Sequence, residues 1–169
     1  MWILLISPQN NVLVDSKGRA RIADYGLSTT CSDLNGTSYI RSNVRWTAPE
    51  LFEVPDTDDT FPPPKPESDI YSFGCIMYQV CPTAYIYAAC KLFSIACQVL
   101  SGHQPYHDIR SDHQVVVAIL RGLKPKRPTI HRIEDCHWDS IQQCWLGVSE
   151  RPAIAGLRDL MGRYRDAIF

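Results

Sequence analysis

The stretch 11-NVLVDSKGRARIADYGLSTT-30 contains two short extended runs on either side of a turn. The first run, 12-VLV-14, is apolar and rich in β-branched residues, 15-DSKG-18 supplies turn residues, and 20-ARIA-23 resumes an extended pattern. This pattern predicts a β-hairpin. Asn11 stands at the entrance of its first strand and Asp24 at the exit of its second, so both side chains can reach one end of the hairpin.

An amide oxygen and a carboxylate at one end of a hairpin suit a hard cation. Mg²⁺ prefers oxygen ligands and is usually held by one or two acidic groups together with phosphates. Asparagine and aspartate also cap turns very commonly. The residues taken alone therefore leave two interpretations of Asn11 and Asp24 open, a metal site and a pair of turn caps.

The rest of the chain favours helices. Residues 28–44 are rich in Ser, Thr, Asn and Gly and predict a long loop, and 53–67 is a proline-rich exposed loop. Pro49 is well placed as the first residue of a short helix. The run 68-SDIYSFGCIMYQV-80 predicts a buried central helix that is apolar nearly all round, with Ser68 or Asp69 as its N-cap.

Three further helices are predicted downstream of this central one. Residues 112–122 form a capped helical pattern with a glycine stop, and residues 137–147 form another. Apolar residues then recur at helical spacing near the C-terminus, at Leu157, Leu160, Met161, Tyr164 and Ile168. The predicted fold class is therefore mainly α with one small β-hairpin.

Composition limits the function classes. The 169 residues are 45% hydrophobic with 17 basic and 18 acidic residues, which is typical of one globular domain and gives no basic stripe for nucleic acid. The seven cysteines show neither a CxxC pair nor a Cys/His ligand spacing, so we expect reduced thiols in a cytoplasmic, intracellular protein. The apolar start 1-MWILLIS-7 is too short to span a membrane.

Five motifs stand in a familiar order along the chain. They are 11-NVLVD-15, 24-DYG-26, 48-APE-50, 69-DIYSFG-74 and 151-RP-152. Together they closely resemble the C-terminal lobe of the eukaryotic protein kinase family, in its tyrosine-kinase-like and tyrosine kinase groups. A single three-residue motif is weak, but five in this order and at this spacing are specific. The resemblance covers nearly the whole chain apart from residues 1–10 and 81–99.

The resemblance implies roles for individual residues. Asn11 matches the catalytic-loop asparagine that binds Mg²⁺, and Asp24 matches the aspartate that holds the metal bridging the ATP phosphates. Glu50 and Arg151 match a buried ion pair, and Asp69 matches an acid that hydrogen-bonds the catalytic loop. The implied cofactors of the intact parent are ATP and Mg²⁺, and the implied partners are protein substrates or signalling proteins, with no oligomeric state indicated.

Other kinase parts do not match. The family's catalytic base lies five residues before the asparagine, where this sequence has Ile6, and Pro8 replaces the lysine that lies three residues before it. No Gly-rich loop and no Val-Ala-Ile-Lys strand can be found in the sequence. We therefore expect residues 1–169 to be a partial kinase domain without its N-terminal lobe, with no catalytic residue of its own and no phosphoryl transfer as written.

The segment 81-CPTAYIYAACKLFSIACQV-99 interrupts the resemblance, because deleting it restores family-like sequence. It could be a membrane segment, although Pro82 and Lys91 argue against that. It could also be an interaction hairpin or helix. We favour translated intron, which together with the non-family start at residues 1–10 points to a gene model with missed splice sites.

Two functions fit these observations. The first is a fragment of an active protein kinase, which transfers phosphate from ATP to Ser/Thr or Tyr in the intact parent. The alternative is a pseudokinase, a protein-interaction module without catalysis, and the replacement of the usual phenylalanine by Tyr25 leans that way. Retention of both Asn11 and Asp24 favours the first.

Overall fold

The computed structural model of the chain describes residues 12–14, 20–22, 43–52, 65–80, 104–129 and 133–166. The described residues are mainly helical with one two-stranded ribbon, which confirms the predicted fold class. The strands are β1 (Val12–Val14) and β2 (Ala20–Ile22), and the helices are α2 (Pro66–Val80), α4 (Asp112–Leu120), α5 (Asp135–Cys144) and α6 (Ile154–Asp166). Short 3-10 turns are η1 (Val44–Trp46), η2 (Pro49–Leu51) and η4 (Val148–Glu150).

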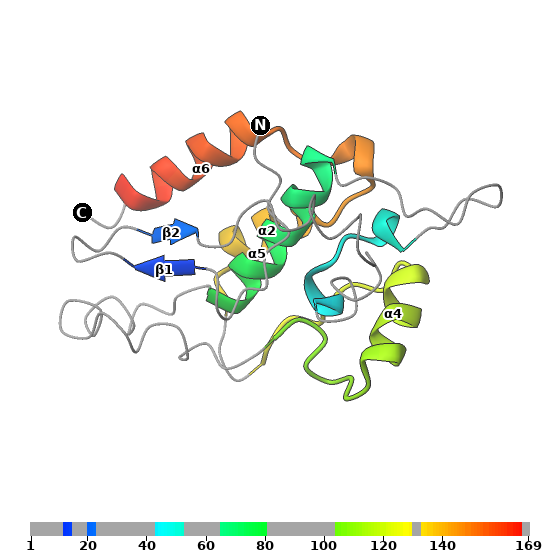
Figure 1. The fold of residues 1–169 in the computed structure, drawn as a ribbon. Coiled ribbons are helices and arrows are strands. Elements are labelled where there is room, and N and C mark those ends of the chain that lie inside the picture. Colours follow the sequence, from blue (N-terminus) through cyan, green and yellow to red (C-terminus); the bar gives the residue numbers. More distant parts are fainter. Residues whose placement is uncertain are drawn as a thin grey trace.

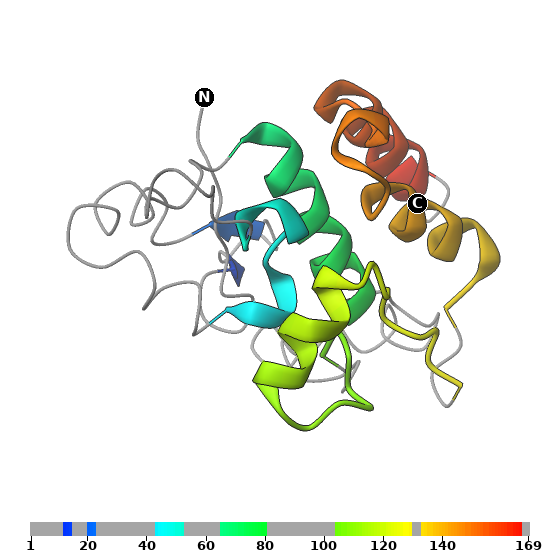
Figure 2. The ribbon, with the colours of Figure 1, turned by 90° about the vertical axis from the view of Figure 1, so that its right-hand side faces the viewer.

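Helix α2 runs through the middle of the helical body (Figure 1). Viewed from the side, η1, η2 and α4 lie on one flank of α2, while α5 and α6 lie on the other (Figure 2). Helix α2 contacts α5, η1 and η4, and α4 contacts η1. The apolar surface of α2 is therefore covered from two sides, as its nearly uniform apolar sequence predicts.

The ribbon at the start of the chain is antiparallel. Val12 pairs with Ile22, Leu13 with Arg21 and Val14 with Ala20. The predicted hairpin is thus confirmed in its two strands. This register places the beginning of β1 and the end of β2 at the same end of the ribbon.

Helix α2 begins earlier than its sequence pattern suggests. It starts at Pro66, so the prediction of Ser68 or Asp69 as N-cap is wrong: both lie within its first turn. Proline is favoured at a helix start because its φ is already helical and its missing N–H would lack an intrahelical partner anyway. Ser68 instead donates its hydroxyl to Glu50 Oε1 at 2.8 Å, so its side chain serves a tertiary contact.

The ends of the other helices follow local chemistry. Gly122 has φ of 72°, and its N–H bonds to Ile119 O, while Leu123 N–H reaches Ala118 O, both at 2.9 Å. This glycine-terminated arrangement confirms the predicted stop after α4. Helix α5 runs over Asp135–Cys144, so it begins two residues and ends three residues earlier than predicted. Trp145 is its C-cap, and Gly147 is the N-cap of the following turn η4.

The main core lies between α2 and α5. Tyr71 and Tyr78 of α2 pack against Trp145, with ring centroids 6.5 Å and 5.9 Å apart, and Trp138 meets Trp145 edge-on at 5.9 Å. Large aromatic rings bury much apolar area and prefer such tilted contacts. The core is completed by further buried side chains, among them Trp46, Leu51, Ile70, Cys75, Ile133, Ile141, Cys144 and Leu157.

Gly74 allows this close approach of α2 to α5. A Cβ atom at Gly74 would lie 2.6 Å from Cβ of Cys144 and 3.0 Å from Nε1 of Trp145. We expect Gly74→Ala to lower the free energy of unfolding by about 1–3 kcal/mol, because the two helices must separate to admit a methyl group. Urea denaturation measures this loss.

Gly156 in α6 provides the matched control. A Cβ atom there meets nothing within 4 Å, so Gly156→Ala is expected to raise stability by about 0.5–1 kcal/mol through helix propensity alone. A Gly74→Ala variant as stable as Gly156→Ala would contradict the packing described for α2 and α5.

Within the described ranges, no helix combines the length and the apolar character needed to cross a lipid bilayer.

Candidate functional site

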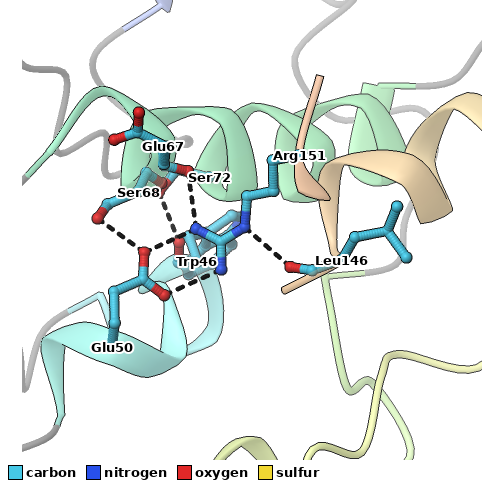
Figure 3. Close-up of polar contacts among 7 residues, drawn as sticks. All are labelled: Trp46, Glu50, Glu67, Ser68, Ser72, Leu146 and Arg151. Carbon is cyan, nitrogen blue, oxygen red and sulfur yellow. Dashed lines mark hydrogen bonds and ion pairs between the residues drawn. The ribbon is translucent and has the colours of Figure 1, made fainter. Parts of the chain in front are cut away.

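Two buried arginines organise the helical body, and the first is Arg151. Its Nη1 lies 2.6 Å from Glu50 Oε1 and its Nη2 lies 2.9 Å from Glu50 Oε2, so the pair is bidentate (Figure 3). The Arg151 side chain is 2% exposed and that of Glu50 is 18% exposed. The ion pair predicted from the motifs is thereby confirmed.

Arg151 also holds two other segments. Its Nη1 donates to the carbonyl of Glu67 at 2.8 Å and its Nε donates to the carbonyl of Leu146 at 3.0 Å (Figure 3). The guanidinium carbon lies 5.2 Å from the centre of the Tyr71 ring, within cation–π range. One side chain therefore joins η2, the first turn of α2 and the loop that follows α5.

The Glu50 carboxylate is held in its charged form. Burial raises the pKa of Glu50, but hydrogen bonds from Arg151 and Ser68 lower it by more, so the net pKa lies below the usual range. A depressed folded-state pKa contributes stability that is present at neutral pH and is lost as the pH falls through that pKa. The ion pair is therefore intact under physiological conditions.

The second arginine, Arg45, projects from η1 toward the loop before α4. Its Nε donates to Asp112 Oδ1 at 3.0 Å. Its two terminal nitrogens donate to four backbone carbonyls at 2.8–3.3 Å, those of Pro105, Tyr106, Ile109 and Arg110. Arg45 is only 5% exposed, so these bonds replace the water that a buried guanidinium loses.

Tyr106 lies at the centre of the loop that Arg45 holds. Its φ of 56° is a left-handed conformation that non-glycine residues seldom adopt. Its hydroxyl donates to the carbonyl of Leu123 at 2.8 Å and lies 3.2 Å from the hydroxyl of Tyr71. Because the Tyr106 proton is used in the bond to Leu123, the Tyr71 hydroxyl donates to the Tyr106 oxygen. Burial raises the pKa of both phenols, so this link between α2 and the loop after α4 is uncharged.

The two arginines fix opposite ends of one short segment. Residues 43–52 are tied through Arg45 to the loop before α4 and through Glu50 to Arg151. Ser72 of α2 adds a hydroxyl bond to the carbonyl of Trp46 at 2.8 Å (Figure 3). The guanidinium groups of Arg45 and Arg151 therefore hold residues 43–52 against α2 and the loop before α4 through protein contacts.

The buried thiols of the core are chemically inert. Burial raises the pKa of Cys75 strongly and that of Cys144 to about 12. A thiol reacts as its thiolate, so neither sulfur is a nucleophile at neutral pH.

The predicted metal ligands Asn11 and Asp24 lie outside the described residues, as do Ile6, Pro8, Tyr25 and segment 81–99. Asp69 lies in the first turn of α2 and is partly buried, while the catalytic loop that the resemblance assigns as its partner is also outside those residues. The sequence motifs do not predict a role for Arg45. One signal was present, since a lone cation inside 43-NVRWTAPELF-52 needs a partner if that run is buried.

Comparison with known proteins finds similarity to protein kinases. The sequence profile described as protein tyrosine and serine/threonine kinase matches residues 8–161. The Raf homolog serine/threonine-protein kinase of Caenorhabditis elegans is 31% identical over 128 residues, which is 72% of this chain and 13% of that protein. Mitogen-activated protein kinase kinase kinase 3 of Arabidopsis thaliana is 30% identical over 148 residues, 87% of this chain and 22% of that protein.

Relatives of the tyrosine kinase type are similar as well. Tyrosine-protein kinase Srms of Mus musculus is 28% identical over 152 residues, 88% of this chain and 25% of that protein. The chain thus spans 13% to 25% of the length of these three relatives.

Proposed function

Because the chain belongs to the protein tyrosine and serine/threonine kinase family, we propose that residues 1–169 carry the helical C-terminal lobe of a protein kinase domain. In its intact form this domain transfers the terminal phosphoryl group of ATP to a hydroxyl group of a protein. Its partners are then protein substrates and signalling proteins. The thiols of Cys75 and Cys144 lie buried in the core, which supports an intracellular, reducing location.

The pairing register of the β-ribbon carries this proposal. Asn11 is bonded to Val12, Asp24 follows two residues after Ile22, and Val12 pairs with Ile22 across the ribbon. Neighbouring strands lie about 4.8 Å apart, and each residue advances the chain by about 3.3 Å. Val12 and Ile22 lie at one end of the ribbon, and the proposal is that Asn11 and Asp24, which flank them in the sequence, share one ion there. An amide oxygen and a carboxylate are suitable ligands for Mg²⁺.

In the proposed activity, Asn11 and Asp24 hold Mg²⁺, which neutralises the charge on the ATP phosphates. Phosphoryl transfer depends mainly on positioning and on charge stabilisation, so the protein contributes by keeping these groups fixed. Residues 43–52 follow the ribbon in the sequence. Arg45 and Arg151 anchor this segment to α2 and α4, which supports a defined platform for the acceptor protein.

The 169 residues alone are proposed to be inactive. Ile6 stands where the family has its catalytic base, and a hydrocarbon side chain cannot accept a proton. Pro8 stands where the family has a lysine, so that position offers no positive charge to contact the transferred phosphate. Two metal ligands exposed to water would then be poorly organised for transfer.

A second candidate is a protein-interaction module without catalysis. Three apolar side chains of α4 and its following loop are 45% to 57% exposed, namely Val117, Leu120 and Leu123. Exposed apolar side chains that lie close together favour contact with another protein. Tyr25 in place of the usual phenylalanine also leans toward this candidate.

Thermal unfolding with ATP and Mg²⁺ separates the two candidates. It is measured on the 169-residue chain and on a chain extended upstream in the same gene by about a hundred residues, the size of the nucleotide-covering lobe. The proposal predicts that only the extended chain is stabilised, by about 2.7 kcal/mol at a hundredfold excess of ligand over Kd. Asp24→Asn in the extended chain should abolish the shift. No shift in either chain would overturn the proposed phosphoryl transfer and favour the interaction module.

A further inference from the structure

Three different metal-binding side chains converge at the start of α5, within the stretch 133-IEDCHWD-139. The ligand atoms of Glu134, Cys136 and His137 all lie within 4.8 Å of one another. Glu134 Oε2 is 4.0 Å from Cys136 Sγ and 3.9 Å from His137 Nδ1. A carboxylate, a thiol and an imidazole therefore face a common point.

The backbone explains why these groups meet. Glu134 is the N-cap residue of α5 and has extended dihedral angles, whereas Cys136 and His137 belong to the first helical turn. An N-cap side chain normally accepts a hydrogen bond from the backbone of that turn. Glu134 makes no such bond, and its carboxylate instead lies beside the two other side chains.

We propose that Glu134, Cys136 and His137 bind one Zn²⁺ ion, with water as the fourth ligand. Zinc accepts sulfur, nitrogen and oxygen ligands at about 2.0–2.3 Å in tetrahedral geometry, which sets ligand atoms about 3.3–3.6 Å apart. The ligand atoms of Cys136 and His137 lie 4.0 Å and 3.9 Å from Glu134 Oε2 and within 4.8 Å of each other, so all three must move closer together to bind the ion. Glu134 and Cys136 are exposed, so rotation of their side chains supplies this movement.

The donor set selects among metals. Thiolate and imidazole favour zinc over Mg²⁺ or Ca²⁺, which take oxygen ligands. This site is therefore chemically different from the oxygen site proposed at Asn11 and Asp24. A result that overturns one proposal leaves the other unaffected.

The charges of the site also balance. The negative charges of the Glu134 carboxylate and the Cys136 thiolate together neutralise the two positive charges of the ion. The positive end of the α5 dipole disfavours cation binding at this place. The nearby Arg127 guanidinium is neutralised by Asp135, at 2.6 Å. Bound zinc would tie the residue that precedes α5 to the first turn of that helix. The proposed role of the ion is structural, and its water ligand lies on the solvent side.

Cobalt(II) tests the site because it replaces zinc and reports its ligands by absorption. The full 169-residue chain is titrated with Co²⁺ under reducing conditions. We expect one Co²⁺ per chain, with a thiolate-to-metal charge-transfer band and the intense visible bands of tetrahedral cobalt. Added Zn²⁺ should displace the cobalt and remove both.

Variants assign the ligands. Cys136→Ser should remove the charge-transfer band, and Glu134→Gln and His137→Gln should each weaken binding at least tenfold. His113→Gln, at an exposed histidine on α4, is the matched control and should bind as the parent does. Circular dichroism checks that each variant is folded.

Three results would overturn the proposal. They are no charge-transfer band in the parent chain, a band of unchanged strength in Cys136→Ser, and equal affinities for the parent and His137→Gln. The second result would assign cobalt to one of the six other cysteines of the chain.

Discussion

Replacement of Arg151 by alanine is expected to lower the free energy of unfolding by about 3–5 kcal/mol. Removing one partner of a buried ion pair leaves the other charge uncompensated, and that loss exceeds the net value of the pair. Here the Glu50 carboxylate would keep only the Ser68 hydroxyl bond among the side-chain partners described for it. The carbonyls of Glu67 and Leu146 would lose a charged donor as well.

Urea denaturation of the parent and of Arg151→Ala measures the loss. Arg158 supplies the control, since it carries the same group but is 79% exposed and meets only its neighbour Asp159 among the described residues. Arg158→Ala is expected to change stability by no more than about 0.5 kcal/mol. Equal unfolding midpoints for the parent and Arg151→Ala would refute the anchoring role of this residue.

Replacement of Arg45 by alanine is expected to cost about 2–4 kcal/mol. A hydrogen bond to a charged group contributes about 1.5–3 kcal/mol, and buried acceptors left without a donor are penalised. Arg45 serves four carbonyls and one carboxylate, but Asp112 is 60% exposed and can return to water. The expected loss of stability in Arg45→Ala is therefore somewhat smaller than that in Arg151→Ala.

Hydrogen exchange distinguishes the two anchors. Arg45→Ala should speed exchange in the loop before α4 and in α4 itself, whereas Arg151→Ala should act on η2 and on the first turn of α2. Arg45→Lys keeps the charge but lacks the planar fork of donors, so an intermediate effect is expected. The same exchange pattern in both alanine variants would contradict the assignment of separate ends of segment 43–52.

Local sequence patterns predicted which segments form helices and strands better than where these begin. The hairpin followed from the two extended runs on either side of the turn residues 15-DSKG-18, and the end of α4 followed from Gly122. The start of α2 was missed because Ser68 looks like a cap in sequence but bonds to Glu50 in space. A contact between residues 18 positions apart cannot be inferred from the helix pattern alone.

Contacts between residues far apart in the sequence were likewise harder to predict than local structure. Glu50 and Arg151 are 101 positions apart, and only the resemblance to a known family linked them before their geometry confirmed the pair. Arg45 bonds mostly to backbone carbonyls, which any residue type provides, so its partners leave no trace in the sequence. The assignment of Asn11 and Asp24 as metal ligands stays a prediction, supported by the register of the strands between them.

Paramagnetic relaxation by Mn²⁺ tests that assignment most directly, because Mn²⁺ prefers the same oxygen ligands as Mg²⁺ and broadens nearby amide signals even when it binds weakly. In a titration of the 169-residue chain, we expect the amides of Val12 and Ile22 to broaden first and Asp24→Asn to abolish this effect. Broadening that leaves these two amides untouched, or that persists unchanged in Asp24→Asn, would contradict the assignment.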